Sequence, residues 1–364
     1  MVKQAAYEFV PDYVPPPGAT LREALEYIGM SQAELARRAG KPEKTISAII
    51  TGDSTITPET AIKLERVLDV PASLWLNLQS GYDRHIELQK ENSRLGAEIS
   101  WMSNFPLAQM IRLGWLQKRE DKVCQLNELL SFLGAASPDA WENNARHLEA
   151  AFRRPRNART SLHSLGAWLR KGEITGAQAM CAPYNETAFR EALASARTLT
   201  IGKLEDIASS LNLLFNPCGV AVALVHELPK APVCGATRWL TPKKALIQLS
   251  LRYKTDDHFW FSFFHEAGHI ALHHKRGVLI EVEGCTGQEE DEANRFAADA
   301  LVPREKWNAF KAKLAGANVS ANSVLAFAKG AGVAPGIVVG RLQHERSLPF
   351  DKLNSLKRKL TWAS

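Results

Sequence analysis

A polar triplet inside a long apolar run restricts the fold of this chain more than any other feature of its sequence. The mostly aromatic residues 259–264 lead into His265, Glu266 and His269, and apolar residues follow directly. On an α-helix, side chains four residues apart lie on the same face, so His265 and His269 can contact one ion. The segment therefore predicts a buried helix that carries part of a metal site.

The spacing of this triplet also points to a reaction. An H-E-x-x-H sequence on a helix is typical of zinc metallopeptidases, in which neutral histidines bind Zn²⁺. Zinc lowers the pKa of its water, and a glutamate at the position of Glu266 takes the proton as hydroxide attacks a peptide carbonyl. The sequence thus predicts a peptide-bond hydrolase, with Glu266 as the general base.

A catalytic zinc site needs a third protein ligand, which we expect downstream. Residues 289–301 form an acidic amphipathic segment that stops before Pro303, as a helix would. Glu290 shares a face with small residues three and seven positions later, so we predict it as the third ligand. A solvated helix start, where carboxylates suit the helix dipole, is the alternative for Glu290. The same solvated position is our preferred interpretation for Glu289, Asp291 and Glu292.

His273 lies one further helical turn beyond His269 and could compete as a ligand. We favour a different interpretation, in which residues 273–276 form the basic last turn of the helix, ended by Gly277.

Three apolar runs precede the histidine-bearing segment, at residues 220–225, 236–240 and 245–251. Prolines separate them, so we expect a small β-sheet. We predict that residues 245–251 form an edge strand, which could hold a substrate peptide as an added strand. A purely structural strand is the alternative.

Combined motifs in this half of the chain resemble the ImmA/IrrE family of metallopeptidases. They are the H-E-x-x-H sequence, the pattern E-x-x-A-N-x-F-A-A at residues 290–298, and Leu-Val-Pro at residues 301–303. The resemblance covers roughly residues 200–350 and includes a C-terminal helix at residues 332–344. It implies a gluzincin-like domain that cleaves a repressor protein with narrow specificity.

Carried onto this chain, the resemblance implies that His265, His269 and Glu290 bind Zn²⁺ and that Glu266 activates water. It identifies no secure transition-state stabiliser. Arg341 and His344 are candidates, but we prefer packing or surface roles for both.

The N-terminal third carries a series of helix-start signals. Capping-box patterns begin at Thr20 and Ser31, and Pro42 and Pro58 stand at first-turn positions. We expect short helices near residues 21–28, 32–39, 42–50 and 58–68. This layout is a helix-turn-helix, whose inner face would comprise Leu35, Ala36, Ile46 and Ile49.

Such a layout predicts which side chains would meet double-stranded operator DNA. The third helix would present its exposed residues to the major groove. The supporting helix and turn would meet the phosphate backbone. The predicted DNA-binding residues are Gln32, Lys41, Glu43, Lys44, Thr45 and Ser47.

Sequence runs at residues 30–36, 50–52, 56–61 and 70–78 resemble the HigA group within the Cro/repressor helix-turn-helix family. That resemblance implies operator binding as a homodimer and neutralisation of a partner toxin.

Charge supports DNA binding less directly. Residues 1–80 hold eight Lys/Arg against ten Asp/Glu, a net charge of −2, although the whole chain carries +6. A module that mediates only dimerisation or partner binding is the alternative.

Length and patterning predict several domains in a mainly α fold with a small β-sheet (α+β). We expect a helix-turn-helix domain at residues 1–80, a connecting helix at 81–100, a helical middle region at 101–200 and the metallopeptidase-like domain at 201–364. No apolar stretch reaches the length of a membrane span and the start lacks a signal sequence, so we expect a cytoplasmic protein without membrane contact. Five scattered cysteines do not suggest a disulfide framework.

Two functions from different classes remain open at this stage. In the first, the chain binds an operator and carries a zinc endopeptidase that cleaves itself or a partner regulatory protein. In the second, it is a non-catalytic antitoxin or repressor whose metallopeptidase-like domain senses a ligand or binds a toxin.

Overall fold

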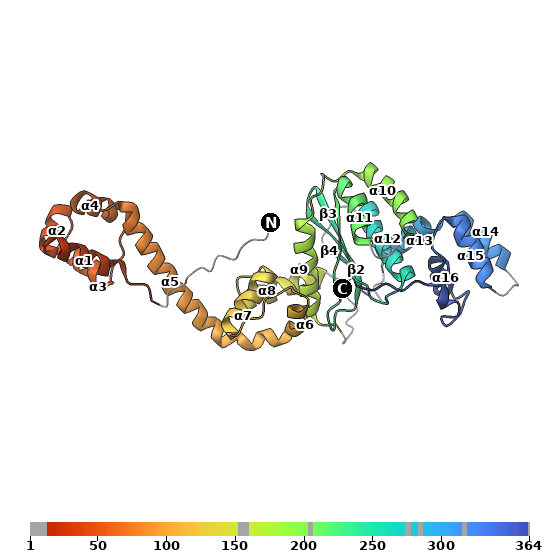
Figure 1. Cartoon of the computed structure of the whole chain (residues 1–364), viewed down its shortest axis with the longest axis horizontal. Helices are drawn as coiled ribbons and strands as arrows, with labels where there is room; N and C mark the ends of the chain where they lie inside the picture. Colours follow the sequence, from red (N-terminus) through yellow and green to blue (C-terminus); the bar gives the residue numbers. More distant parts are fainter. Residues whose placement is uncertain are drawn as a thin grey trace. The chain divides into compact units, whose positions relative to one another are not determined.

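The computed structural model describes residues 13–151, 160–202, 207–273, 278–282, 287–314 and 319–362. The chain divides into two compact units, residues 1–99 and 100–364. Both units are drawn in Figure 1.

The first unit is entirely helical in its described part. Its core collects residues from every helix, including Leu21, Leu35, Ile46, Leu64 and Trp75. The inner face predicted from the sequence is buried as expected. The helices are α1 (Pro17–Ile28), α2 (Gln32–Ala39), α3 (Glu43–Thr51), α4 (Pro58–Leu68) and α5 (Ala72–Glu98).

Local capping explains most of these boundaries. Oγ of Ser31 accepts a hydrogen bond from the Glu34 amide (3.2 Å), and Gly40 ends α2 in the left-handed region at φ 60°. The predicted capping box at Thr20 is wrong, because α1 begins one turn earlier, at Pro17. Proline is favoured at a first helical position, since its fixed φ suits the helix and its missing N–H is not needed there.

The second unit opens with helices that precede the sheet. They are the 3₁₀ helix η1 (Ile99–Asn104) and the helices α6 (Leu107–Arg112), α7 (Lys122–Leu133), α8 (Pro138–Ala151), α9 (Leu162–Gln178), α10 (Glu186–Leu199) and α11 (Ile207–Phe215), with a short 3₁₀ helix η2 (Asn216–Cys218) leading to the first strand.

Four strands form the sheet of the second unit, in the order β1-β3-β2-β4. They are β1 (Val220–Leu224), β2 (Val233–Thr241), β3 (Lys244–Leu249) and β4 (Val278–Val282). Strand β3 pairs in parallel with β1 and antiparallel with β2, and β4 pairs antiparallel with β2. The predicted edge position of residues 245–251 is therefore wrong: β3 is internal, because β1 returns to its free side.

Helices cover both faces of this sheet (Figure 1). On one face, Nε2 of Gln248 in β3 donates a hydrogen bond to the carbonyl of Trp168 in α9 (2.7 Å). On the other, Oγ1 of Thr237 in β2 donates to the carbonyl of Glu266 in α12 (Asp256–Leu272; 3.0 Å). Helix α9, from the region expected as a separate helical segment at residues 101–200, thus covers one face of the sheet within the same unit.

Further helices complete the unit on the far side of α12. They are α13 (Gln288–Leu301), α14 (Arg304–Leu314), α15 (Ala321–Ala331) and α16 (Pro335–His344), followed by the 3₁₀ helix η3 (Asn354–Leu356). The prediction of a mainly α fold with a small sheet is confirmed. Within the described ranges, no single helix is long and apolar enough to span a membrane; α15 and α16 reach that length and hydropathy only as a pair bent by 113°.

Candidate metal centre

Two helices bring three potential ligands together in the second unit. His265 and His269 come from α12 and Glu290 from the first turn of α13, and their ligand atoms all lie within 4.8 Å of one another. The Nε2 atoms of the two histidines are 3.0 Å apart. The Glu290 carboxylate lies 3.2 Å from Nε2 of His265 and 3.6 Å from Nε2 of His269. The structure therefore places the three residues predicted from the sequence around one point.

Close packing of α12 against α13 makes this convergence possible. A Cβ on Gly268 would lie 3.0 Å from Cδ1 of Phe296 and 3.3 Å from Cα of Ala293. Ala293 and Ala297 are fully buried on the facing side of α13. Small residues on both helices thus let the backbones approach until short Glu and His side chains meet.

Hydrogen bonds outside the triplet orient both imidazoles. Nδ1 of His265 donates to Oδ1 of Asn294 (2.9 Å), because an amide oxygen only accepts. Nε2 of His273 lies 3.1 Å from Oε2 of Glu292 and donates to that carboxylate. Nδ1 of His269 lies 2.9 Å from Nδ1 of His273, and donation to that atom leaves the Nε2 lone pair of His269 for a cation. In this arrangement both ligand histidines are in the Nδ1–H tautomer.

This tautomer decides what can occupy the centre. Nε2 of His265 and Nε2 of His269 each present a lone pair toward the other, and the Glu290 carboxylate adds further lone pairs. Acceptors that face one another in a buried site need a positive charge between them. Two imidazole nitrogens and a carboxylate oxygen are also a donor set that binds transition-metal ions. The residues present fit a metal ion.

The charge states of the residues at the centre suit the binding of a cation. Burial lowers the pKa of His269 to about 3, so its imidazole is neutral at pH 7. Burial opposes ionisation of Glu290, but its contacts with His265 and the neighbouring imidazoles hold the pKa of Glu290 below its usual range. The set therefore combines neutral nitrogens with a negative carboxylate.

Glu266 occupies the position next to the ligands where a base would act. It is fully buried, as are His265 and His269, with exposed fractions of 0%, 1% and 1%. A Cβ on Gly235 of β2 would lie 2.6 Å from Oε1 of Glu266. Glycine at this position is thus required for β2 to pass the Glu266 carboxylate.

Sequence reasoning missed the residues that orient the ligands. Glu292 was expected to be a solvated helix start and His273 part of a basic helix end, but they form a chain from His269 to the surface. Helix α12 ends at Leu272, one residue before His273, and Gly277 lies outside the described residues. The four-residue step from His269 to His273 was a signal for a shared helix face.

Arg341 has a structural position rather than a place at the centre. Its Nη1 donates to the carbonyls of Ala298 and Val302 at the end of α13 (2.8 and 3.0 Å), and its guanidinium lies over the Trp307 ring. Arginine at a helix C-terminus satisfies carbonyls that have no partner within the helix.

In the first unit, the residues predicted for DNA binding lie on the surface of α2, α3 and the turn between them. Glu43, Lys44, Ser47 and Gln32 are exposed and Thr45 is half-buried. Lys41 is engaged within the unit, since its Nζ lies 3.2 Å from Glu59 of α4 and its side chain is only 16% exposed.

Comparison with known families matches each unit separately. Residues 21–75 match the helix-turn-helix family, and residues 225–333 match the IrrE N-terminal-like domain. Both resemblances inferred from the sequence are thereby confirmed.

Curated relatives match the first unit. The uncharacterized HTH-type transcriptional regulator YddM of Escherichia coli (strain K12) is 38% identical over 68 residues, which is 19% of this chain and 72% of the relative. Virulence-associated protein A of Dichelobacter nodosus is 30% identical over 99 residues, 27% of this chain and 93% of that protein.

Solved structures also resemble part of the chain. An addiction module antidote protein of the HigA family from Coxiella burnetii is 32% identical and covers 23% of this chain and 94% of its own, with a TM-score of 0.22. The Pseudomonas aeruginosa antitoxin HigA, solved with the higBA promoter, is 31% identical and covers 24% of this chain and 95% of its own, with a TM-score of 0.23.

Proposed function

The chain belongs to the helix-turn-helix transcriptional regulators and carries an IrrE N-terminal-like domain, and from this premise we propose that it is a DNA-binding regulator with a zinc-dependent endopeptidase. The peptidase would cleave the chain itself or a partner regulatory protein. The observation that carries the proposal is the convergence of His265, His269 and Glu290, with Glu266 beside them.

Zn²⁺ would be held by Nε2 of His265, Nε2 of His269 and the Glu290 carboxylate, a set found in catalytic zinc sites. When bound there, Zn²⁺ supplies Lewis acidity that polarises a peptide carbonyl and lowers the pKa of water. Asn294 and His273 hold the two imidazoles so that their lone pairs face the ion.

Glu266 is the proposed general base in this mechanism. Its carboxylate accepts a proton from the attacking water and returns it to the leaving amine. Oγ1 of Thr237 holds the backbone carbonyl of Glu266, and Gly235 leaves room for its side chain. Among the described strands, β4 lies at an edge of the sheet, so we propose it, rather than β3, as the place where a substrate strand adds.

Operator binding is proposed for the exposed face of α3, with Lys44, Thr45 and Ser47 toward the bases and Gln32 near the phosphates. A homodimer would place two such helices on two half-sites. A repressor or a toxin is the proposed protein partner.

A second candidate is a non-catalytic antitoxin or repressor that uses the metal domain as a sensor or docking scaffold. The near-complete burial of Glu266 favours it, because a substrate must reach that carboxylate before it can act.

Comparison of wild type with Glu266→Gln separates the two candidates. Cells expressing each form would be compared by mass spectrometry for new protein N-termini, including those of the chain itself. We expect new termini with the wild type and a loss of about 10²–10⁴-fold in their rate of formation with the variant. Zinc content and operator binding should be unchanged.

Undiminished cleavage by Glu266→Gln, with the metal still required, would remove Glu266 as the base. Absence of any cleavage by a zinc-loaded wild type, with its operator binding intact, would support the non-catalytic regulator.

A further inference from the structure

A second concavity lies in the same unit as the metal centre but on the opposite face of β2. It is a cavity of about 500 Å³ between α7, α8, α9 and β2, a volume typical of small-molecule sites. Arg238 and Thr237 are neighbours on β2, so their side chains point to opposite faces. Thr237 contacts α12, whereas Arg238 faces α9 and the cavity. The cavity is thus separate from the residues of the proposed peptidase.

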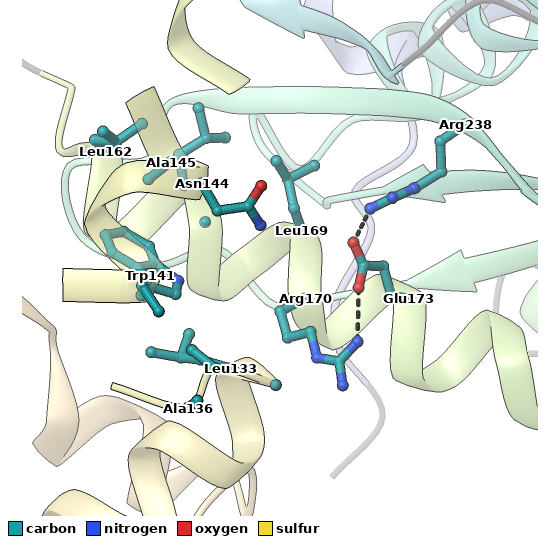
Figure 2. Close-up of a pocket in the computed structure, with 15 residues that line it drawn as sticks. Leu133, Ala136, Trp141, Asn144, Ala145, Leu162, Leu169, Arg170, Glu173 and Arg238 are labelled. Carbon is teal, nitrogen blue, oxygen red and sulfur yellow. Dashed lines mark hydrogen bonds and ion pairs between the residues drawn. The ribbon is translucent and has the colours of Figure 1, made fainter. Parts of the chain in front are cut away.

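One side of this cavity is charged. Glu173 of α9 pairs with Nη1 of Arg170 (2.8 Å) and, through its other oxygen, with Nη1 of Arg238. Two guanidinium groups share one carboxylate, which leaves a net charge of +1 at the cavity wall. Figure 2 shows these three side chains together, with Glu173 between the two arginines.

Apolar side chains form most of the rest of the wall, together with the polar side chain of Asn144. Trp141 of α8, Leu133 of α7 and Leu169 of α9 line the cavity away from the charged group (Figure 2). Trp141 is held in place, since its ring stacks on His163 at a centroid distance of 4.8 Å and fits against Gly166, where a Cβ would lie 2.8 Å away. A rigid aromatic surface therefore faces a cationic one across the cavity.

Arg238 has unused hydrogen-bonding capacity. Its Nε is buried and has no hydrogen-bond acceptor among the described residues. An unsatisfied buried donor costs free energy, so such a group calls for an explanation. Burial and the nearby charge of Arg170 also lower the pKa of Arg238. The charged guanidinium is therefore destabilised at this position, and an added negative charge would stabilise it.

We propose that this cavity binds a small organic carboxylate with an aromatic or aliphatic body. The carboxylate contacts Arg238 and Arg170, because a planar guanidinium fork matches a carboxylate in geometry and charge. The body of the ligand lies against Trp141 and Leu133. Nothing in this site depends on the metal ion or on the peptidase reaction.

Calorimetric titration of the full chain with 2-naphthoate tests this proposal. We expect 2-naphthoate to bind at least about tenfold more tightly than the neutral 2-naphthalenemethanol, since the latter keeps the rings and lacks the charge. Binding of the alcohol with equal affinity, or no binding of 2-naphthoate at millimolar concentration, would overturn the proposal.

Three variants assign the binding to the charged group. Arg238→Gln should weaken 2-naphthoate by at least about tenfold, because it leaves Arg170 and Glu173 as a neutral pair. Glu173→Gln should strengthen binding several-fold, because it removes the competing carboxylate. Arg190→Gln is the matched control, since Arg190 is exposed on α10 and pairs with Glu186 away from the cavity.

Thermal unfolding of each variant shows that it is folded, and Arg170→Gln replaces Arg238→Gln if the latter is not. Equal affinities of wild type and a folded Arg238→Gln or Arg170→Gln would contradict the assigned site.

Discussion

The two compact units keep their candidate functional groups in opposite environments. In the first unit, Lys44 and Ser47 project from the surface of α3, and the helix packs through Ile46 and Ile49 on its other side. In the second unit, His265, Glu266 and His269 are almost completely buried within α12. The candidate residues of the first unit are exposed on its surface, whereas those of the second unit are buried in its interior.

This difference determines what kind of argument each site allows. Burying three ionisable side chains costs several kcal/mol unless partners or a cation compensate, so the second unit itself indicates that something positive belongs between them. Exposed side chains on α3 cost nothing in the free protein. DNA binding by the first unit therefore rests on its family and not on an energetic requirement of its fold.

The largest effect confined to one unit is expected at α3. Lys44→Ala combined with Thr45→Ala should weaken operator binding by about a hundredfold, since each good base contact contributes about 1–3 kcal/mol. Gel shifts on an operator selected with the wild-type protein measure the effect, and zinc content should not change. Lys63→Ala, which breaks only the pair with Glu59 on α4, is the control. Unchanged operator binding by the double variant would show that the recognition helix is misassigned.

The next effect concerns the residues that orient the metal ligands. His273→Ala and Asn294→Ala should each weaken zinc binding by about 10–100-fold, because outer hydrogen bonds fix the tautomer and direction of ligand histidines. Competition with a chelator gives the affinities. His258→Ala is the matched control, since His258 is exposed on the same helix. If the three variants bind zinc equally, the tautomers assigned here are wrong.

A smaller effect tests the independence of the two units. Gly18→Ala should destabilise the first unit by about 1–3 kcal/mol, because the new Cβ would lie 2.0 Å from the carbonyl oxygen of Ile49. Gly81→Ala in α5 meets no atom within 4 Å and should instead stabilise by about 0.5–1 kcal/mol. Thermal unfolding with zinc content as a second readout checks both. Loss of zinc from Gly18→Ala would show that the stability of the first unit affects the metal centre of the second.

The smallest effect is a dependence of stability on pH. The pKa of His269 is about 3 in the folded chain against an ordinary 6.5, because burial disfavours the charged imidazole. Between these values the unfolded chain binds a proton that the folded chain does not. The free energy of unfolding of the metal-free protein should therefore fall as pH drops from about 6.5 towards 3.

Denaturant unfolding in the presence of a chelator, at pH 7 and pH 5, measures this slope. His269→Gln should flatten it by at most about 1.4 kcal/mol per pH unit. Equal slopes for wild type and His269→Gln would contradict the low pKa.

Sequence predicted best what depends on local contacts. The cap at Ser31 and the proline at position 58 mark the starts of α2 and α4, since both act within the first helical turn. The same holds for the metal site. The four-residue spacing of His265 and His269 and the position of Glu290 on the small-residue face of its helix follow from helical periodicity alone.

Contacts between segments far apart in the sequence could not be predicted from local patterns. The internal place of β3 depends on β1 and β2 flanking it, and nothing in its own residues distinguishes it from an edge strand. Likewise, the hydrogen bond from Gln248 to Trp168 joins residues 80 positions apart, so sequence patterns did not reveal that α9 covers the sheet. Glu292 looked like a solvated carboxylate because its partner, His273, comes from another helix end.

The metal content of the purified full chain tests the central claim most directly. Mass spectrometry of the wild type and of His265→Ala, both folded and both supplied with zinc, is the measurement. We predict about one zinc per wild-type chain and none in the variant, because loss of one imidazole leaves only two of the three ligands. A wild-type chain that takes up no metal, or a variant that keeps it, would contradict the assignment of this centre.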